Sequence, residues 1–168
     1  DFVSWDSYPD WHTQEQTDVA SSTAFLHDLY RSMKGRSYLL MESAPGCVNW
    51  KEVNTLKRPG LDTLQSLQTI AHGGDSVQYF QWRKSRGSLE KFHGAIVDHV
   101  GTNETRIFKT VSETGRRLKS IDEIAGTFVN AKVALMYDWE NMWALNDSMG
   151  FKLQRKRYNE TCLSYYKA

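Results

Sequence analysis

The sequence predicts an α/β fold built on a parallel sheet with helices on its faces. Short continuous apolar runs, typical of buried parallel strands, alternate with segments in which apolar residues recur every three or four positions, as on one face of a helix. Glycines follow several of the helical segments, where they favour a stop. Alternation of this kind connects parallel strands, and ligands bind beyond the carboxyl ends of such strands in open sheets and closed barrels alike.

The composition is that of an ordinary globular domain. Of 168 residues, 40% are hydrophobic and 24% charged, and the net charge of +1 gives no strong field for nucleic acid or an acidic membrane. No apolar run approaches the roughly 20 residues that span a bilayer. The 6 Trp, 8 Tyr and 7 Phe suit a carbohydrate site, although core packing explains them more simply. We therefore expect neither nucleic acid nor a membrane as a partner.

Two cysteines, Cys47 and Cys162, lie far apart and have no metal-ligand spacing. They do not make a disulfide framework, so we expect free thiols in a reducing compartment, the cytoplasm. The sequence contains no glycine-rich phosphate loop and no Gly-x-Ser-x-Gly motif. We expect neither a metal nor a cofactor in this chain.

The first half of the chain contains two strand–helix pairs. Residues 2–5 are a short strand candidate, and residues 18–33 have the apolar spacing of a helix. Residues 38–41 are an unbroken apolar run, which predicts a buried strand. A loop with two prolines then leads to a helix over residues 61–72.

The second half continues the alternation. A third strand is predicted over residues 76–82, a helix over residues 105–124, a fourth strand over residues 133–137 and a short helix near residues 160–166. The chain starts at Asp1 and enters a strand almost at once, so we expect a fragment of a longer protein.

The three leading strands are expected to bring their carboxyl ends to one rim. Each ends in aromatic or charged residues, namely Trp5-Asp6, Met41-Glu42 and Trp82-Arg83. Polar residues often end strands, so this pattern favours a site at the rim only modestly.

Glu42 is the strongest single candidate for a catalytic residue. It follows four apolar residues, so its carboxylate would stand at the lip of the sheet and face a cleft. A carboxylate held there can attack an anomeric carbon or relay a proton. From position alone, an ion pair with a Lys or Arg at the strand end explains Glu42 equally well.

Glu90 and His93 lie three residues apart in the second long loop and would share one face if that stretch is helical. Together they could hydrogen-bond neighbouring sugar hydroxyls. Glu-x-x-His also forms half of a di-iron site in four-helix bundles, but partner glutamates are not apparent in the sequence. A solvated loop pair is the simpler alternative.

Several long runs have the order and spacing of one known family. Residues 39–45 (LLMESAP), followed by residues 48–50 (VNW), resemble the nucleophile segment of the glycoside hydrolase family 42 β-galactosidases. The other matching runs are residues 57–60 (KRPG), 76–83 (SVQYFQWR), 90–94 (EKFHG) and 133–143. The similarity covers essentially the whole chain, and runs of this length are much more specific than a short motif.

The resemblance implies a (β/α)₈ barrel followed by an α/β domain that mediates trimers. Residues 1–128 would be the C-terminal part of the catalytic barrel, about strands six to eight. Residues 129–168 would begin the trimerisation domain, and the intact protein would be a homotrimer acting on β-galactosides. The cysteine zinc cluster of some members belongs to a region absent here, so the resemblance implies no metal.

The resemblance also implies a role for each candidate residue. The family releases terminal β-D-galactose with retention of configuration, by a double displacement between two carboxyl groups about 5 Å apart. Glu42 matches the nucleophile. The positions that match the galactose subsite are Trp50, Phe80, Glu90 and His93. Tyr8 matches a tyrosine near the nucleophile. The acid/base of the family, in an Asn-Glu pair at strand four, has no counterpart here, so the chain alone should have little or no turnover.

Two other classes of function remain open at this point. A non-catalytic carbohydrate-binding module is supported by the aromatic content alone. A doubly wound α/β protein that binds a nucleotide conflicts with the missing phosphate loop. Within the family, an α-L-arabinopyranoside differs from a galactoside only by its missing hydroxymethyl group, so the sequence does not separate these two substrates.

Overall fold

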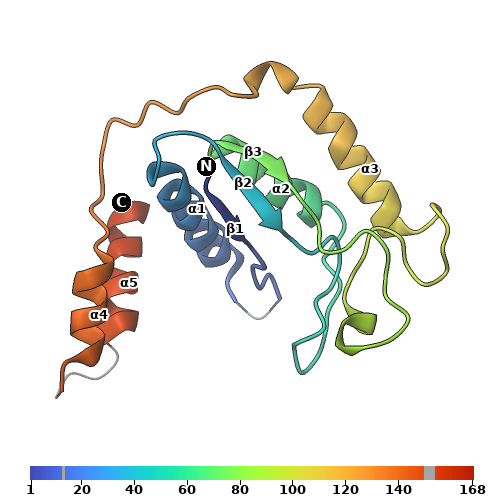
Figure 1. The fold of residues 1–168 in the computed structure, drawn as a ribbon, viewed down its shortest axis with the longest axis horizontal. Coiled ribbons are helices and arrows are strands. Elements are labelled where there is room, and N and C mark those ends of the chain that lie inside the picture. The colour runs from blue at the N-terminus through green and yellow to red at the C-terminus, as the bar shows by residue number, and fades with distance from the viewer. Residues whose placement is uncertain (13, 150–153) are drawn as a thin grey trace. The chain divides into compact units, whose positions relative to one another are not determined.

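The computed structural model describes residues 1–12, 14–149 and 154–168. By its contacts the chain divides into two compact units, Asp1–Val129 and Asn130–Ala168, which are treated separately below. The first unit contains a three-stranded parallel sheet in the order β1-β2-β3 (Figure 1). The strands are β1 (Ser4–Asp6), β2 (Tyr38–Glu42) and β3 (Gly74–Val77). This arrangement confirms the predicted α/β class.

Three helices of the first unit follow the strands. These are α1 (Gln16–Ser32), α2 (Leu61–Ala71) and α3 (Arg106–Lys119). The predicted spans of the first two agree with the structure within about two residues. The third helix is shorter than predicted, because it ends at Lys119 and residues Asp122–Ile124 form a separate 3-10 turn, η2. A second 3-10 turn, η1 (Leu89–Phe92), lies in the long loop after β3.

The third strand is also shorter than predicted. Residues 76–82 were expected to be extended in the sheet, whereas β3 ends at Val77. The Gln78 amide still donates to the Leu40 carbonyl at 2.9 Å, but Gln81 and Trp82 pair instead with the loop that follows η1. The Phe80–Gln81 peptide bond is cis. The backbone partners of residues 81 and 82 therefore lie in a loop, which no period-two pattern can reveal.

One face of the sheet packs on α1 and α2. Tyr38 and Leu40 are fully buried, since alternate residues of β2 point to this face. The Tyr38 hydroxyl lies 2.6 Å from His27 Nδ1 of α1 and donates to the Thr69 carbonyl of α2 at 3.2 Å. Met41, which points the other way, is 38% exposed. The buried strand was predicted correctly.

His27 makes the stability of this packing depend on pH. Burial lowers the pKa of His27 to about 3, and the nearby His72 adds to the effect. The unfolded chain takes up this proton near pH 6.5, so the stability is complete above that pH and is lost as the pH falls towards 3. We expect the free energy of unfolding to fall by up to about 1.4 kcal/mol per pH unit in this range.

Urea unfolding of the protein between pH 7 and pH 4 measures this effect. The carboxylates contribute their own pH dependence, so the matched control is His27→Gln, which keeps a polar side chain beside Tyr38 and does not titrate. The difference between the two proteins should shrink as the pH falls. Parallel curves for the two proteins would contradict the assignment to His27.

The second unit is a helical hairpin. It contains α4 (Trp139–Asp147), whose first turn is capped by the Asp138 carboxylate, and α5 (Gln154–Lys167). Met142 and Cys162 are buried, and the Tyr137 hydroxyl donates to Asn159 Oδ1 at 2.8 Å. The helix predicted near residues 160–166 lies within α5, while α4 was not predicted.

The fourth strand, predicted over residues 133–137, is wrong. This segment is irregular, and Val133 and Met136 are each 85% exposed. An apolar run becomes a strand only when a neighbouring strand supplies its hydrogen-bond partners, and none of the described residues pairs with it. Separately, none of the helices in the described ranges is both long enough and apolar enough to cross a bilayer.

Candidate active site

Glu42 is the last residue of β2, at the carboxyl edge of the sheet. The Tyr8 hydroxyl donates a hydrogen bond of 2.7 Å to Glu42 Oε2. Burial raises the pKa of Tyr8, and the hydrogen bond to Glu42 raises it further, so the phenol keeps the proton that it donates. The sequence-predicted pair Glu42 and Tyr8 is thus in direct contact, although 34 positions separate the two residues.

Four aromatic rings meet beside this carboxylate. His93 lies at their centre, with its ring centroid 4.9 Å from Phe80, 5.3 Å from Trp50 and 6.0 Å from Tyr8. Trp50 in turn contacts the Tyr8 ring edge to face at 4.9 Å. Trp50 is 54% exposed, so part of its indole face remains free. The structure therefore gathers these four predicted residues into one cluster.

Two buried polar atoms, one in the cluster and one on nearby Glu90, whose charge acts on Tyr8, have no partner among the described residues. His93 is fully buried, and its Nδ1 lies 3.0 Å from the Gly94 carbonyl, which can only accept. In the neutral ring Nδ1 therefore carries the proton, and Nε2 is left as an unsatisfied acceptor. Glu90 Oε2 is likewise buried and unsatisfied. Buried polar atoms are normally paired, so these two mark a place for a hydrogen-bonding ligand.

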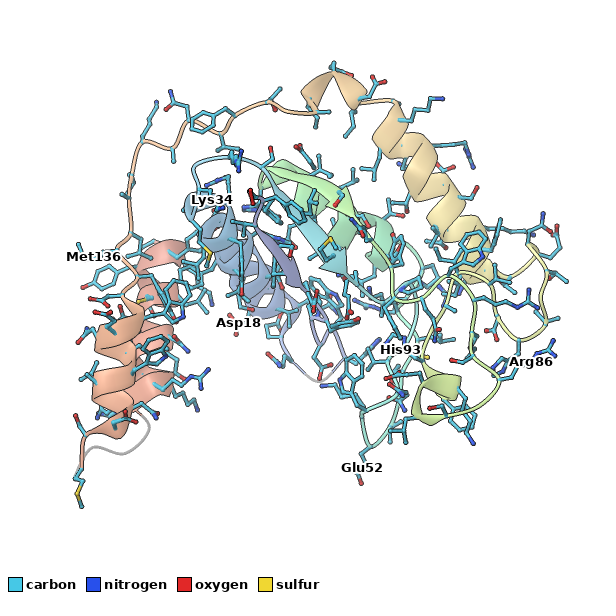
Figure 2. The ribbon with its side chains drawn as sticks, in the orientation of Figure 1. Asp18, Lys34, Glu52, Arg86, His93 and Met136 are labelled. Carbon is cyan, nitrogen blue, oxygen red and sulfur yellow. The ribbon has the colours of Figure 1, made fainter. Side chains whose placement is uncertain are left out.

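The loop that follows β2 is hydrogen-bonded to the loop that contains η1, and together they hold the cluster. The Gly94 amide donates to the Cys47 carbonyl at 2.8 Å, and Asn49 Nδ2 donates to the Leu89 carbonyl at 2.6 Å. A side chain at Gly94 would place its Cβ 2.6 Å from the Cys47 carbonyl oxygen, so only glycine allows this approach. Figure 2 shows His93 where the two loops meet. Residues from both loops therefore keep one fixed arrangement.

The rim was only partly predicted. Asp6 and Glu42 do end adjacent strands and pair with each other after a register shift between Trp5 and Asp6, and the pKa of Asp6 is raised by burial and by the Glu42 charge. Trp82 does not belong to this rim, because β3 has already ended and the Trp82 side chain is 66% exposed. Phe80 occupies the corresponding place in the cluster.

Sequence reasoning missed the polar side chains beneath the loop that follows Glu42. Gln65 of α2 donates to Ser43 Oγ at 3.0 Å, and the Trp11 indole donates to Gln65 Oε1 at 3.2 Å. Lys57 donates to the Ala44 carbonyl at 2.5 Å. A Lys in a polar loop normally indicates a solvated position, so the sequence offered no signal that Lys57 is buried.

The described side chains include no group of three or more His, Cys, Asp or Glu residues placed to hold a metal ion. The chemistry available to this site is that of a carboxylate, a phenol, an imidazole and aromatic faces. A carboxylate beside aromatic rings and unsatisfied hydrogen-bond groups can bind a polyhydroxylated ring and attack an electrophilic carbon in it.

Two family models match the chain. A model described as β-galactosidase matches residues 1–121, and one described as β-galactosidase trimerisation domain matches residues 131–168. Among curated relatives, β-galactosidase GalA of Bacillus licheniformis is 52% identical over 170 residues and covers 100% of this chain. β-Galactosidase GanA of Bacillus subtilis is 50% identical and covers 99% of it. The chain spans only 25% of the length of either relative.

Solved structures agree with these matches. A catalytic mutant of Gan42B, a glycoside hydrolase family 42 β-galactosidase from G. stearothermophilus, superposes with a TM-score of 0.95 at 52% identity. The cold-adapted β-galactosidase from Rahnella sp. R3 superposes with a TM-score of 0.95 at 51% identity. Each comparison covers 99% of this chain and 25% of the solved one.

Proposed function

Because this chain belongs to glycoside hydrolase family 42, the family of these β-galactosidases, we propose that it forms part of a retaining β-galactosidase with Glu42 as the nucleophile. In this enzyme the Glu42 carboxylate attacks the anomeric carbon of a terminal β-D-galactoside and forms a galactosyl-enzyme, which water then hydrolyses. The observation that carries the proposal is the Glu42 carboxylate, held by the Tyr8 hydroxyl beside two unsatisfied buried polar atoms.

The four cluster residues and Glu90 form the galactose subsite in this proposal. Trp50 and Phe80 pack on the apolar faces of the sugar, because C–H groups and aromatic faces attract each other. Glu90 Oε2 and His93 Nε2 accept hydrogen bonds from sugar hydroxyls, which satisfies the two buried acceptors. Tyr8 keeps Glu42 aligned for attack through its 2.7 Å hydrogen bond.

The wider architecture follows the same family. We assign residues 1–128 to about strands six to eight of a (β/α)₈ barrel, and residues 129–168 to the start of the trimerisation domain of a homotrimer. The boundary between the two compact units, at Val129, and the family match from residue 131 support this division. The acid/base carboxyl comes from strand four, outside this chain. Two free cysteines fit an enzyme of the cytoplasm.

Activity assays on two proteins test the proposal. The full-length enzyme that contains this chain should hydrolyse an aryl β-galactoside, and proton NMR should detect β-galactose as the first product. The 168-residue chain alone should be slower by at least the roughly 10²–10⁴-fold contribution of general acid catalysis, since it lacks the proton donor. Release of α-galactose first, or full activity in the chain alone, would contradict the proposal.

A further inference from the structure

A buried ion pair lies beneath the segment that follows Glu42. The side chain of Lys57 is 8% exposed and that of Asp62 is 4% exposed, and Lys57 Nζ lies 3.5 Å from Asp62 Oδ1. Burial lowers the pKa of Lys57 and raises that of Asp62, while the charge of each partner opposes the effect. Apolar side chains often replace such a pair at no loss of stability, so its presence calls for a role other than stability.

The ammonium group is directed at the backbone next to Glu42. Lys57 Nζ donates a 2.5 Å hydrogen bond to the carbonyl of Ala44, two residues beyond Glu42. Ala44 and Ser43 are themselves buried, so this carbonyl depends on Lys57 for its partner within the described part of the chain. A charged donor makes a short, strong hydrogen bond that fixes the orientation of the acceptor.

The same ion pair also contacts the segment that follows β3. Asp62 Oδ2 accepts a hydrogen bond of 2.9 Å from the Tyr79 hydroxyl. Tyr79 precedes Phe80, and the Phe80 amide donates to the Ser43 carbonyl at 3.0 Å. Lys57 and Asp62 are therefore linked both to the backbone after Glu42 and to the segment that carries Phe80.

We propose that Lys57, with its charge balanced by Asp62, is a positioning residue for the nucleophile. It holds the Ala44 carbonyl and so sets where the Glu42 carboxylate stands relative to a sugar bound by the Trp50 and His93 cluster. This gives a role to Lys57, the first residue of the run 57–60 (KRPG) that resembles the family. The inference rests on the proposed role of Glu42 as nucleophile.

The test is the double variant Lys57→Met/Asp62→Asn in the full-length enzyme. Methionine fills the volume of the lysine, and asparagine can still accept from Tyr79, so neither charge is left unpaired. We expect the variant to melt within a few degrees of the parent and to bind galactose in calorimetry within about threefold. We expect kcat to fall by roughly 10- to 100-fold, since a displacement near 1 Å can cost about 10²-fold.

The matched control is Lys109→Met/Glu104→Gln, which removes an ion pair whose side chains are 60% and 72% exposed. It should leave kcat within twofold of the parent. A folded Lys57→Met/Asp62→Asn variant with a parental kcat would overturn the proposal, as would equal losses in kcat and galactose affinity. If that variant does not fold, Lys57→Gln/Asp62→Asn decides, because it keeps two polar side chains of similar size but removes the charged donor to the Ala44 carbonyl. A kcat at least threefold lower with unchanged galactose affinity supports the proposal, and a parental kcat overturns it.

Failure of this inference is distinguishable from failure of the proposed function. A parent that does not hydrolyse β-galactosides, or a Glu42→Gly variant with parental kcat, refutes the function itself. A parent that is active and loses activity with Glu42→Gly, but tolerates Lys57→Met/Asp62→Asn, refutes only the positioning role.

Discussion

Replacing Glu42 with glycine in the full-length enzyme is expected to lower kcat for an aryl β-galactoside by on the order of 10⁴-fold or more, because in the proposed mechanism the covalent step loses its nucleophile. The vacated space lies beside the Tyr8 hydroxyl, which is now 2.7 Å from Glu42 Oε2. Azide can enter it and attack from the same face as the carboxylate did. Added azide should therefore restore part of the activity and yield the α-galactosyl azide.

The matched control for this experiment is Glu52→Gly. Glu52 is an exposed carboxylate in the same loop region, away from His93 in Figure 2. It should retain parental kcat and show no response to azide. Formation of the β-galactosyl azide, or parental activity in Glu42→Gly, would exclude Glu42 as the nucleophile.

Replacing Glu90 with alanine is expected to lower kcat/KM for the galactoside by roughly 10³-fold or more, because a site built to pair a hydroxyl depends strongly on that contact. Glu90 Oε2 is buried and has no partner in the described part of the chain, so a bound sugar hydroxyl would be its hydrogen-bond donor. A substrate that lacks this hydroxyl should lose the same factor in the parent.

Monodeoxy aryl galactosides measure this coupling directly. The parent should discriminate against each of them, whereas Glu90→Ala should stop discriminating against the one whose missing hydroxyl contacted Glu90. Glu104→Ala serves as the control, because the Glu104 side chain is 72% exposed and forms an ion pair with Lys109, whose side chain is 60% exposed. If Glu90→Ala keeps the parental pattern across the whole series, Glu90 does not contact a sugar hydroxyl. The same series applied to His93→Ala identifies the hydroxyl bound by Nε2.

Much of the fold was predictable because it depends on local pattern. The apolar run from Tyr38 to Met41 has the character of a buried strand, and the structure buries Tyr38 and Leu40 fully. The run from Val133 has a similar character and is nevertheless irregular. The two runs differ in the strands beside them, since β2 is hydrogen-bonded to β1 on one side and to β3 on the other. Composition within one segment carries no information about which other segments are present to pair with it.

Less of the site than of the fold was predictable, and that part rested on the family resemblance more than on local pattern. Glu42 could be singled out because it ends a buried apolar run, but position alone left a strand-end ion pair equally open, and the family resemblance then favoured a nucleophile and indicated the residues around it. The burial of Lys57 and its contact with Ala44 could not be anticipated, because both depend on how the loop folds back under β2. The tautomer of His93 is set by the Gly94 carbonyl, which also becomes visible only in three dimensions.

The close approach at Gly94 has a consequence for recombining this chain with its relatives. The Cys47 carbonyl leaves no room for a side chain at that position, and the Asn49 side chain is bonded to the Leu89 backbone. The segments around residues 43–50 and 89–94 therefore form one exchangeable block, although a strand and a helix separate them in the sequence. Chimeras with crossover points between these segments should lose activity more often than chimeras that inherit both from the same parent.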